Sequence, residues 1–163
     1  VAYLGTGAKV WIIDVGRSYE KACRNFGGSF IDFTENAALS LNPFTLVQDI
    51  DEDMELLQPL LAQMVSPREP LDGFQYSTLG AAIKKVWKAK GNAMRVSDVH
   101  ELLATGRLDE ESRDDDRRLM DLAAMLHPYT VDGAYGKYFE SDATIDFSAD
   151  FIVLELEELK AKK

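Results

Sequence analysis

Short apolar runs alternate with apolar stripes at helical spacing along the chain. Residues 9–14 form an apolar run rich in β-branched and aromatic residues, which predicts a buried strand. The spacing in residues 18–26 predicts a helix that ends at Gly27 and Gly28, and the alternation in residues 29–33 predicts a second strand. A helix between two strands implies parallel pairing through a right-handed crossover. The opening of the chain is therefore predicted to be α/β.

The pattern becomes helical between about residues 50 and 127. Four apolar stripes predict four helices joined by short links, with Pro59 expected to kink or split the first helix. The stripes are Met54, Leu57, Leu60, Leu61 and Met64; Leu79, Ile83, Val86 and Trp87; Val99, Leu102 and Leu103; and Leu119, Leu122, Ala123 and Leu126. Strands are predicted again at 143–147 and 151–156. We therefore expect a partial α/β core at 1–48, an all-α insertion at 49–128 and a return to the core at 129–163.

The composition is that of an acidic globular chain. Its 163 residues are 46% hydrophobic and carry a formal net charge of −10. Binding to a nucleic-acid backbone depends on clustered Lys and Arg, so strong direct nucleic-acid binding is not expected. No apolar run reaches the roughly 18 residues that a membrane span needs. The single cysteine, Cys23, excludes an internal disulfide framework and suits a reducing compartment.

The end of the first predicted strand carries the most promising chemistry. There, hydrophobic residues give way to Asp14, Arg17 and Ser18 before the predicted helix begins. In open α/β sheets, ligands bind at the carboxyl ends of strands. An acid and a base three residues apart can orient water, phosphate or a neighbouring subunit. They can equally form an ordinary salt bridge, with Ser18 as the N-cap of the helix, and both interpretations stay open.

Other candidate sites lack part of the chemistry that they would need. Residues 5–9 are rich in glycine, but Gly-Lys-Ser/Thr is not contiguous and the stretch precedes a strand, so a phosphate loop is not predicted. His100 and His127 have no partners at metal-ligand spacing, and the acidic clusters lack the pattern of a calcium loop. We therefore predict neither a metal site nor catalytic residues.

Two further surfaces receive structural interpretations. A lysine-rich stretch, residues 84–90, contains Trp87 and is interpreted as a solvated helix face, with an acidic partner or nucleic acid as the alternative. The aromatic, glycine-rich loop at 129–139 could stack on a partner or a base. It is interpreted as a hydrophobic cluster that covers a joint between subdomains.

Several blocks of the chain resemble the TraC-like ATPases of conjugative type IV secretion. These blocks are residues 11–21, 27–33 and 41–44, and the ending at 151–159 is similar to that family too. The resemblance implies part of a RecA-like P-loop core interrupted by an all-α insertion. It also implies a parent protein that uses ATP and Mg and forms a homo-hexamer. Such a motor would work with other secretion-system subunits at the cytoplasmic face of the bacterial inner membrane, powering pilus assembly and DNA or protein transfer.

The chain departs from that family in its catalytic motifs. It contains no Gly-x-x-x-x-Gly-Lys-Ser/Thr and no apolar strand ending in an Asp-Glu pair, on which phosphoryl transfer depends. Because it begins at Val1 without methionine, we expect a fragment of a longer protein that neither hydrolyses ATP nor holds a cofactor alone. The resemblance implies that Asp14, Arg17 and Ser18 line the nucleotide site beside the phosphate loop or relay its state to a neighbouring subunit.

Two other functions are compatible with parts of this pattern. A standalone α/β interaction module with a helical insertion and no enzymology is the main alternative. A phosphorylated signalling receiver is suggested only by a strand that ends in Asp14. The helical block at 50–127 interrupts the order of elements that a receiver needs.

Overall fold

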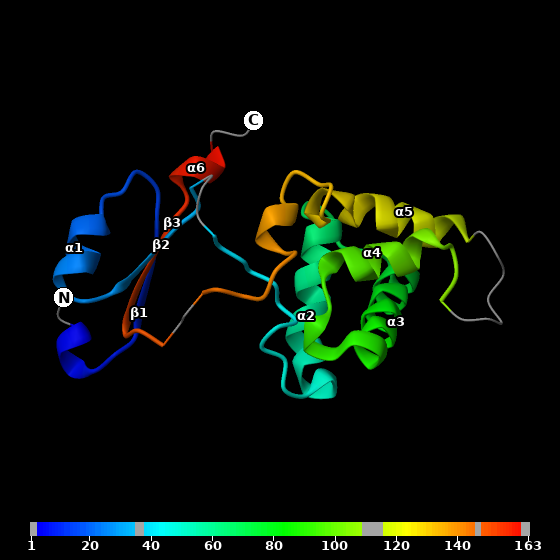
Figure 1. Ribbon diagram of the computed structural model, residues 1–163, viewed down its shortest axis with the longest axis horizontal. Coiled ribbons are helices and arrows are strands. Elements are labelled where there is room, and N and C mark those ends of the chain that lie inside the picture. The colour runs from blue at the N-terminus through cyan, green and yellow to red at the C-terminus, as the bar shows by residue number, and fades with distance from the viewer. Residues whose placement is uncertain (1–2, 35–37, 109–115, 146–147, 161–163) are drawn as a thin grey trace. The chain divides into compact units, whose positions relative to one another are not determined.

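The structure, a computed structural model, describes residues 3–34, 38–108, 116–145 and 148–160 (Figure 1). The chain divides into two compact units, which are described separately. The α/β unit comprises Val1–Leu39 and Thr144–Lys163, and the helical unit comprises Ser40–Ala143. In the part of the chain that the structure describes, no helix combines the length and the apolarity that crossing a membrane would require.

The α/β unit is built on a parallel sheet of three strands (Figure 1). The strands are β1 (Val10–Asp14), β2 (Ser29–Asp32) and β3 (Phe151–Glu155), and their order is β1-β3-β2. The last strand in the sequence is therefore the central one, because β1 and β2 both pair with β3. These parallel strands and the separate helical unit confirm the predicted α/β class with an all-α insertion.

One face of the sheet packs against α1 (Glu20–Asn25). Cys23, Phe151 and Val153 form the buried centre of this contact. Burial raises the pKa of the Cys23 thiol. Gly28 makes the close approach possible, because a Cβ atom there would lie 2.7 Å from the Phe151 carbonyl oxygen and 2.9 Å from Cys23 Sγ.

Two local predictions for the α/β unit need correction. The helix predicted from Ser18 begins at Glu20, and its N-cap is Tyr19. Residues 143–145 are not a strand, and residues 146 and 147 of that predicted strand lie outside the described residues. At the start of the chain the structure has a short 3₁₀ helix, Leu4–Thr6, whose C-cap is the left-handed Gly7.

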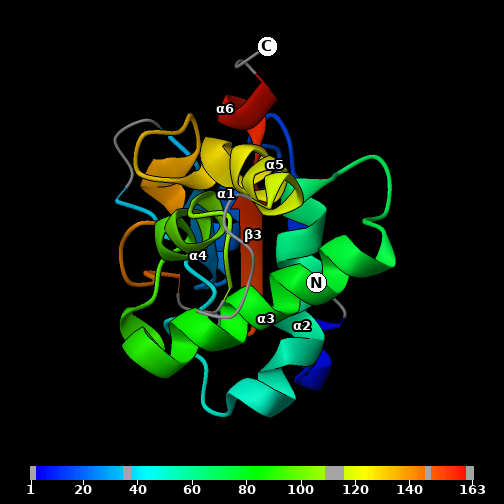
Figure 2. The ribbon, with the colours of Figure 1, turned by 90° about the vertical axis from the view of Figure 1, so that its right-hand side faces the viewer.

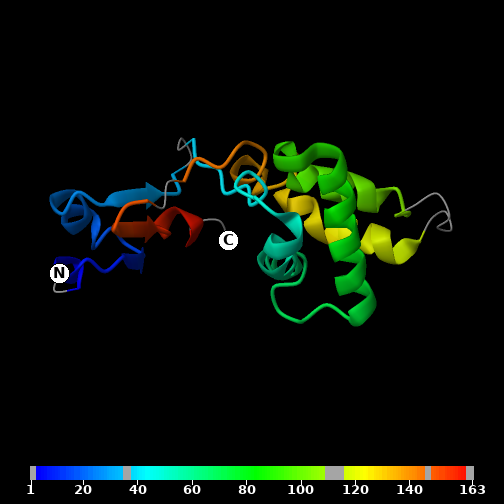
Figure 3. The same ribbon diagram turned by 90° about the horizontal axis from the view of Figure 1, so that it is seen from below.

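The helical unit contains the four predicted helices. They are α2 (Ile50–Val65), α3 (Gly73–Lys90), α4 (Val96–Ala104) and α5 (Arg117–Leu126). In this unit α3 packs on α2, and α5 packs on α4 (Figure 2, Figure 3). The helix predicted to kink or split at Pro59 is not split, because it is continuous from Ile50 to Val65. Its N-cap is Asp49, whose side chain accepts hydrogen bonds from the amides of residues 51 and 52.

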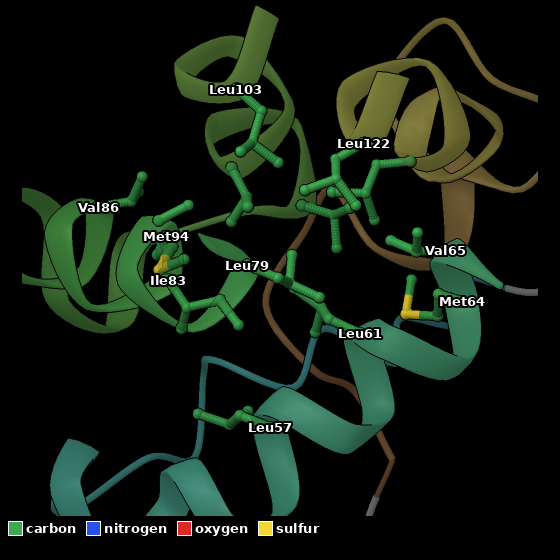
Figure 4. Close-up of a cluster of buried hydrophobic side chains, with 14 of the residues drawn as sticks. Leu57, Leu61, Met64, Val65, Leu79, Ile83, Val86, Met94, Leu103 and Leu122 are labelled. Atoms are coloured by element: carbon green, nitrogen blue, oxygen red, sulfur yellow. The ribbon is translucent and has the colours of Figure 1, made fainter. Parts of the chain in front are cut away.

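The predicted apolar stripes form one core between these helices. Leu61 of α2, Leu79 of α3 and Leu122 of α5 come together there (Figure 4). Leu60, which was predicted to belong to the first stripe, is instead 45% exposed. Trp87, Tyr129 and Phe139 are partly buried against the same core. The aromatic loop is therefore part of the hydrophobic packing of the helical unit.

Candidate functional site

Each strand of the sheet ends in an acidic residue. Asp14, Asp32 and Glu155 are the last residues of β1, β2 and β3, and Glu155 is paired in register with the other two. Because the strands are parallel, all three carboxylates lie at the same edge of the sheet, where β1 leads toward α1 and β3 toward α6 (Glu157–Lys160) (Figure 1). This edge is the place where open α/β sheets bind ligands.

Glu155 is fully buried and holds the loop that follows β1. Its Oε2 accepts a 2.6 Å hydrogen bond from the amide of Arg17, and its Oε1 accepts one of 3.1 Å from the amide of Gly16. Oε1 also accepts a 2.8 Å hydrogen bond from the amide of Glu157 at the start of α6. Backbone donors thus replace the water that burial removes from this carboxylate. The Glu155 side chain therefore hydrogen-bonds both to the turn that follows β1 and to the turn that follows β3.

The loop held by Glu155 has an uncommon backbone conformation. Gly16 has a φ of 106° and Arg17 a φ of 58°. Arg17 is the only non-glycine residue with a positive φ among the residues that the structure describes. A side chain in the left-handed region is unfavourable, so the surrounding contacts must hold this conformation in place.

Arg17 presents an exposed guanidinium at this edge. Its Nη2 pairs with Asp32, and its Nη1 lies 3.2 Å from Oε2 of Glu20. The hydrogen bond with Glu20 and the interactions with Asp32 raise the pKa of Arg17, while the pKa of Glu20 is lowered, chiefly by Arg17. Because the arginine side chain remains 42% exposed, the guanidinium can also meet a ligand or another subunit.

Asp14 does not form the salt bridge with Arg17 that was one of the two interpretations of the sequence. It is buried, and its two oxygens accept 2.9 Å hydrogen bonds from the amides of Val15 and Tyr19. The Asp14 carboxylate thus holds the amide of Tyr19, the N-cap residue of α1, whereas Ser18, which was predicted to be the N-cap, is exposed and precedes it. Arg17 pairs across the sheet edge with Asp32, so the spacing of Asp14 and Arg17 does not make them an ion pair.

Asp32 is incompletely satisfied. Its Oδ2 pairs with Arg17, whereas its Oδ1 is buried and has no hydrogen-bond partner in the described part of the chain. An unsatisfied buried oxygen is uncommon and needs an explanation, such as a bound group or an alternative position of a partner. Among the described residues, no group of three or more His, Cys, Asp or Glu is arranged to hold a metal ion.

Glu155, Asp32 and Glu20 also belong to this site, and the sequence-based prediction did not include them. A usable signal was present, since Glu155 follows the buried run of residues 151–154 as Asp14 follows the first strand. Asp32 and Glu155 each lie one residue before the end of a predicted strand, at 29–33 and 151–156, so a comparison of the strand ends would have found both acids.

The remaining sequence candidates have structural surroundings. The rings of His100 and His127 lie 5.7 Å apart, and burial followed by the charge of His127 lowers the pKa of His100. In the lysine-rich stretch, Lys84 pairs with Asp51 and Lys90 with Asp98. These contacts fit the predicted solvated helix face.

The aromatic loop is organised around Tyr129. Its ring stacks on Tyr135 at 5.5 Å and meets Phe139 edge-on at 5.6 Å. Burial raises the pKa of Tyr129. The ring contacts and the packing on the helical core support the interpretation of this loop as a hydrophobic cluster.

Known proteins resemble this chain in sequence or in fold. The TraG P-loop domain family matches residues 1–163. The chain is 34% identical over 157 residues to the protein TraC of Escherichia coli (strain K12), covering 94% of this chain and 18% of TraC. The structure of VirB4 of Thermoanaerobacter pseudethanolicus matches with a TM-score of 0.72 and 18% sequence identity, covering 98% of this chain and 63% of that chain.

A second sequence match is shorter and is to a protein of a different description. Over 88 residues the chain is 35% identical to the CCR4-Not complex 3'-5'-exoribonuclease subunit Ccr4 of Aspergillus clavatus, covering 52% of this chain and 13% of that protein. This match leaves half of the chain unaccounted for, whereas the TraG P-loop domain family accounts for all of it. The chain spans less than two thirds of each of these relatives.

These similarities test the family resemblance that was inferred from the sequence. The fold shared with VirB4 includes the helical unit as well as the sheet, because it covers nearly the whole chain. The identity to TraC and the family match confirm the resemblance to the TraC-like proteins of conjugative type IV secretion. On this sequence and this fold, the chain belongs to the TraG P-loop domain family.

Proposed function

We propose that this chain is part of an ATPase motor of conjugative type IV secretion and that its residues 14–18 form one wall of the nucleotide site. Membership of the TraG P-loop domain family and the identity to TraC support this assignment. The parent protein uses ATP and Mg and works as a homo-hexamer with other secretion-system subunits. It acts at the cytoplasmic face of the inner membrane and powers pilus assembly and the transfer of DNA or protein.

The described residues fit part of a nucleotide site. The guanidinium of Arg17 is suited to a phosphate group, because its planar donors match phosphate oxygens. Magnesium needs further ligands, since the described residues hold no cluster of acids and histidines that could bind a metal ion. The chain also lacks Gly-x-x-x-x-Gly-Lys-Ser/Thr. Turnover therefore requires residues of the parent outside this chain, and the chain alone is inactive.

The placement of Arg17 carries the proposal. Its side chain is exposed at the carboxyl ends of the strands, and its backbone amide is fixed by the buried Glu155. Asp14 fixes the start of α1 on the other side of the same loop. Arg17 can thus meet the terminal phosphate of a bound nucleotide or an acidic group of a neighbouring subunit, with Ser18 exposed beside it.

Replacing Arg17 in the full-length parent tests the proposal. Arg17→Ala should reduce ATP turnover about tenfold or more, as expected when one charge-stabilising donor is lost. Arg24→Ala is a matched control, because Arg24 also pairs with Glu20 but lies in α1. It should retain the wild-type rate.

Assembly of the parent is measured in parallel by sedimentation. A lower ATP turnover with normal assembly supports contact with the nucleotide, and loss of both supports contact with a neighbouring subunit. Wild-type turnover together with normal assembly for Arg17→Ala would rule out the proposed wall.

A further inference from the structure

Three leucines of the helical unit lie exposed around one groove. Leu46, Leu56 and Leu60 are 66%, 76% and 45% exposed. They line a groove of about 220 Å³ together with residues of α2 and of the segment that precedes it. We name this surface the leucine groove; its other lining residues are Pro43, Val47, Asp53 and Leu57. Exposed apolar side chains that gather around a groove are a feature of interaction surfaces, whereas single scattered ones are not.

Both sides of the leucine groove are held in place by the rest of the helical unit. Leu56 and Leu60 are four residues apart on α2, so they lie on the same face of the helix. The opposite side of the groove is anchored in the core by Phe44, which is fully buried. The side chain of Asn92 holds this segment by donating hydrogen bonds to the carbonyls of Phe44 and Val47, at 3.1 Å and 2.8 Å.

The surroundings of the groove are acidic. From Ser40 to Val65 the chain contains Asp49, Asp51, Glu52, Asp53 and Glu55 and no Lys or Arg. Asp53 lines the groove, and Glu52 lies four residues before Leu56 on α2. Lys84 of α3 pairs with Asp51 and neutralises a single one of these acids. The groove thus combines an apolar lining with one acidic lining residue, Asp53, in a segment of the chain that carries only negative charge.

The negative charge around the leucine groove limits which molecules can bind there. A second copy of the chain would bring the same acids against each other, and like charges across an interface oppose association. Anionic lipids and nucleic acids would be repelled for the same reason. We propose that the leucine groove docks an amphipathic helix of another protein, with an apolar stripe flanked by Lys or Arg. All of these residues belong to the helical unit, so this surface is independent of the Arg17 loop.

Two synthetic helical peptides of the same apolar stripe test the charge selection. One carries lysines beside the stripe and the other glutamates, and binding to the chain is followed by fluorescence anisotropy. The lysine peptide should bind at least about tenfold more tightly, a preference that shrinks as salt rises. Equal binding of the two peptides would overturn the proposal.

Substitutions then locate the site. Leu56→Ser and Leu60→Ser should each weaken binding of the lysine peptide by about tenfold, as for anchor residues of an interface. Val131→Ser is the control, since Val131 is 68% exposed in the same unit but does not line the groove. An equal effect of the control, or no effect of the two leucine substitutions in correctly folded variants, contradicts the assignment.

Two further measurements address the other occupants. Sedimentation of the chain tests whether a second copy is the occupant, and we expect no self-association through the groove. Self-association that Leu56→Ser abolishes would identify a second copy as the occupant and would overturn the proposal. In the full-length parent, a thiol introduced by Leu56→Cys should react rapidly with a maleimide. Protection of that thiol in the isolated parent would show that its own polypeptide covers the groove, and would overturn docking of another protein.

Discussion

The amide of Arg17 donates a 2.6 Å hydrogen bond to the buried carboxylate of Glu155, although 138 positions separate the two residues in the sequence. The contact joins the loop after the first strand of the sheet to the end of the last. It fixes the backbone of the one described non-glycine residue with a positive φ. The position of an exposed guanidinium therefore depends on a carboxylate that no solvent reaches.

Glu155→Gln should destabilise the α/β unit by about 1–3 kcal/mol, because an amide group replaces one acceptor oxygen with a donor that faces backbone N–H groups. Hydrogen exchange of the amides of Gly16, Arg17 and Glu157 is the direct measurement, and all three should lose protection. Glu158→Gln is the control, since Glu158 is exposed. Unchanged protection in Glu155→Gln would mean that the carboxylate does not hold the loop.

Arg17→Gly should be more stable than Arg17→Ala by about 1 kcal/mol, because glycine adopts the left-handed backbone without the cost that Cβ imposes. Both variants lose the same ion pairs, so this difference reports the backbone alone. At Arg24, inside α1, the order should reverse, since glycine is the poorer helix former. Urea unfolding of the four variants measures both differences; the same order at the two positions would contradict the assigned conformation.

Gly28→Ala should cost about 1–3 kcal/mol through overpacking, because the added methyl group meets the Phe151 carbonyl and Cys23 at less than 3 Å. Gly5→Ala is the comparison, since no atom lies within 4 Å of a Cβ there. Thermal unfolding followed by circular dichroism measures both changes. Equal stability of the two variants would mean that α1 does not pack so closely on the sheet.

The helical unit should lose stability as the pH falls below about 6.5, the ordinary pKa of histidine. Burial, and after it the charge of His127, lowers the pKa of His100 in the folded chain. The unfolded chain then binds more protons between the two pKa values, so stability rises with pH through that window and is complete above it. Thermal unfolding at pH 7.5 and 5.5 should show a smaller pH effect for His100→Gln than for the wild type. An identical pH effect would exclude His100 as its source.

The pattern of apolar residues was sufficient to predict most elements. The four helices of the insertion follow from periodicity, because each buries a regular apolar stripe. The first strand follows from its continuous apolar run, although Trp11 and Ile13 are exposed in it. Pro59 did not split α2, since packing of residues on both sides of it keeps the helix continuous. The rule that serine caps helices failed at Ser18 because α1 begins at Glu20 with Tyr19 as its N-cap. The buried carboxylate of Asp14 accepts the hydrogen bond of the Tyr19 amide.

The site was only half predictable for a physical reason. Asp14, Arg17 and Ser18 are local in sequence, and a polar stretch after an apolar strand is visible without a structure. Glu155 and Asp32 join them only through the strand order, which periodicity does not determine. The partner of Arg17 is thus set by β3 lying between β1 and β2.

That strand order also sets a sequence of events in folding. Because β1 and β2 each pair with β3 and not with each other in the described sheet, neither can complete its ladder before the central strand is available. During synthesis the residues of the helical unit emerge before β3 does, so the helices can assemble through local contacts first. The sheet must wait for the closure of a loop of more than a hundred residues between Asp32 and Phe151. In the newly made chain, the loop that displays Arg17 is consequently among the last parts to reach its final conformation.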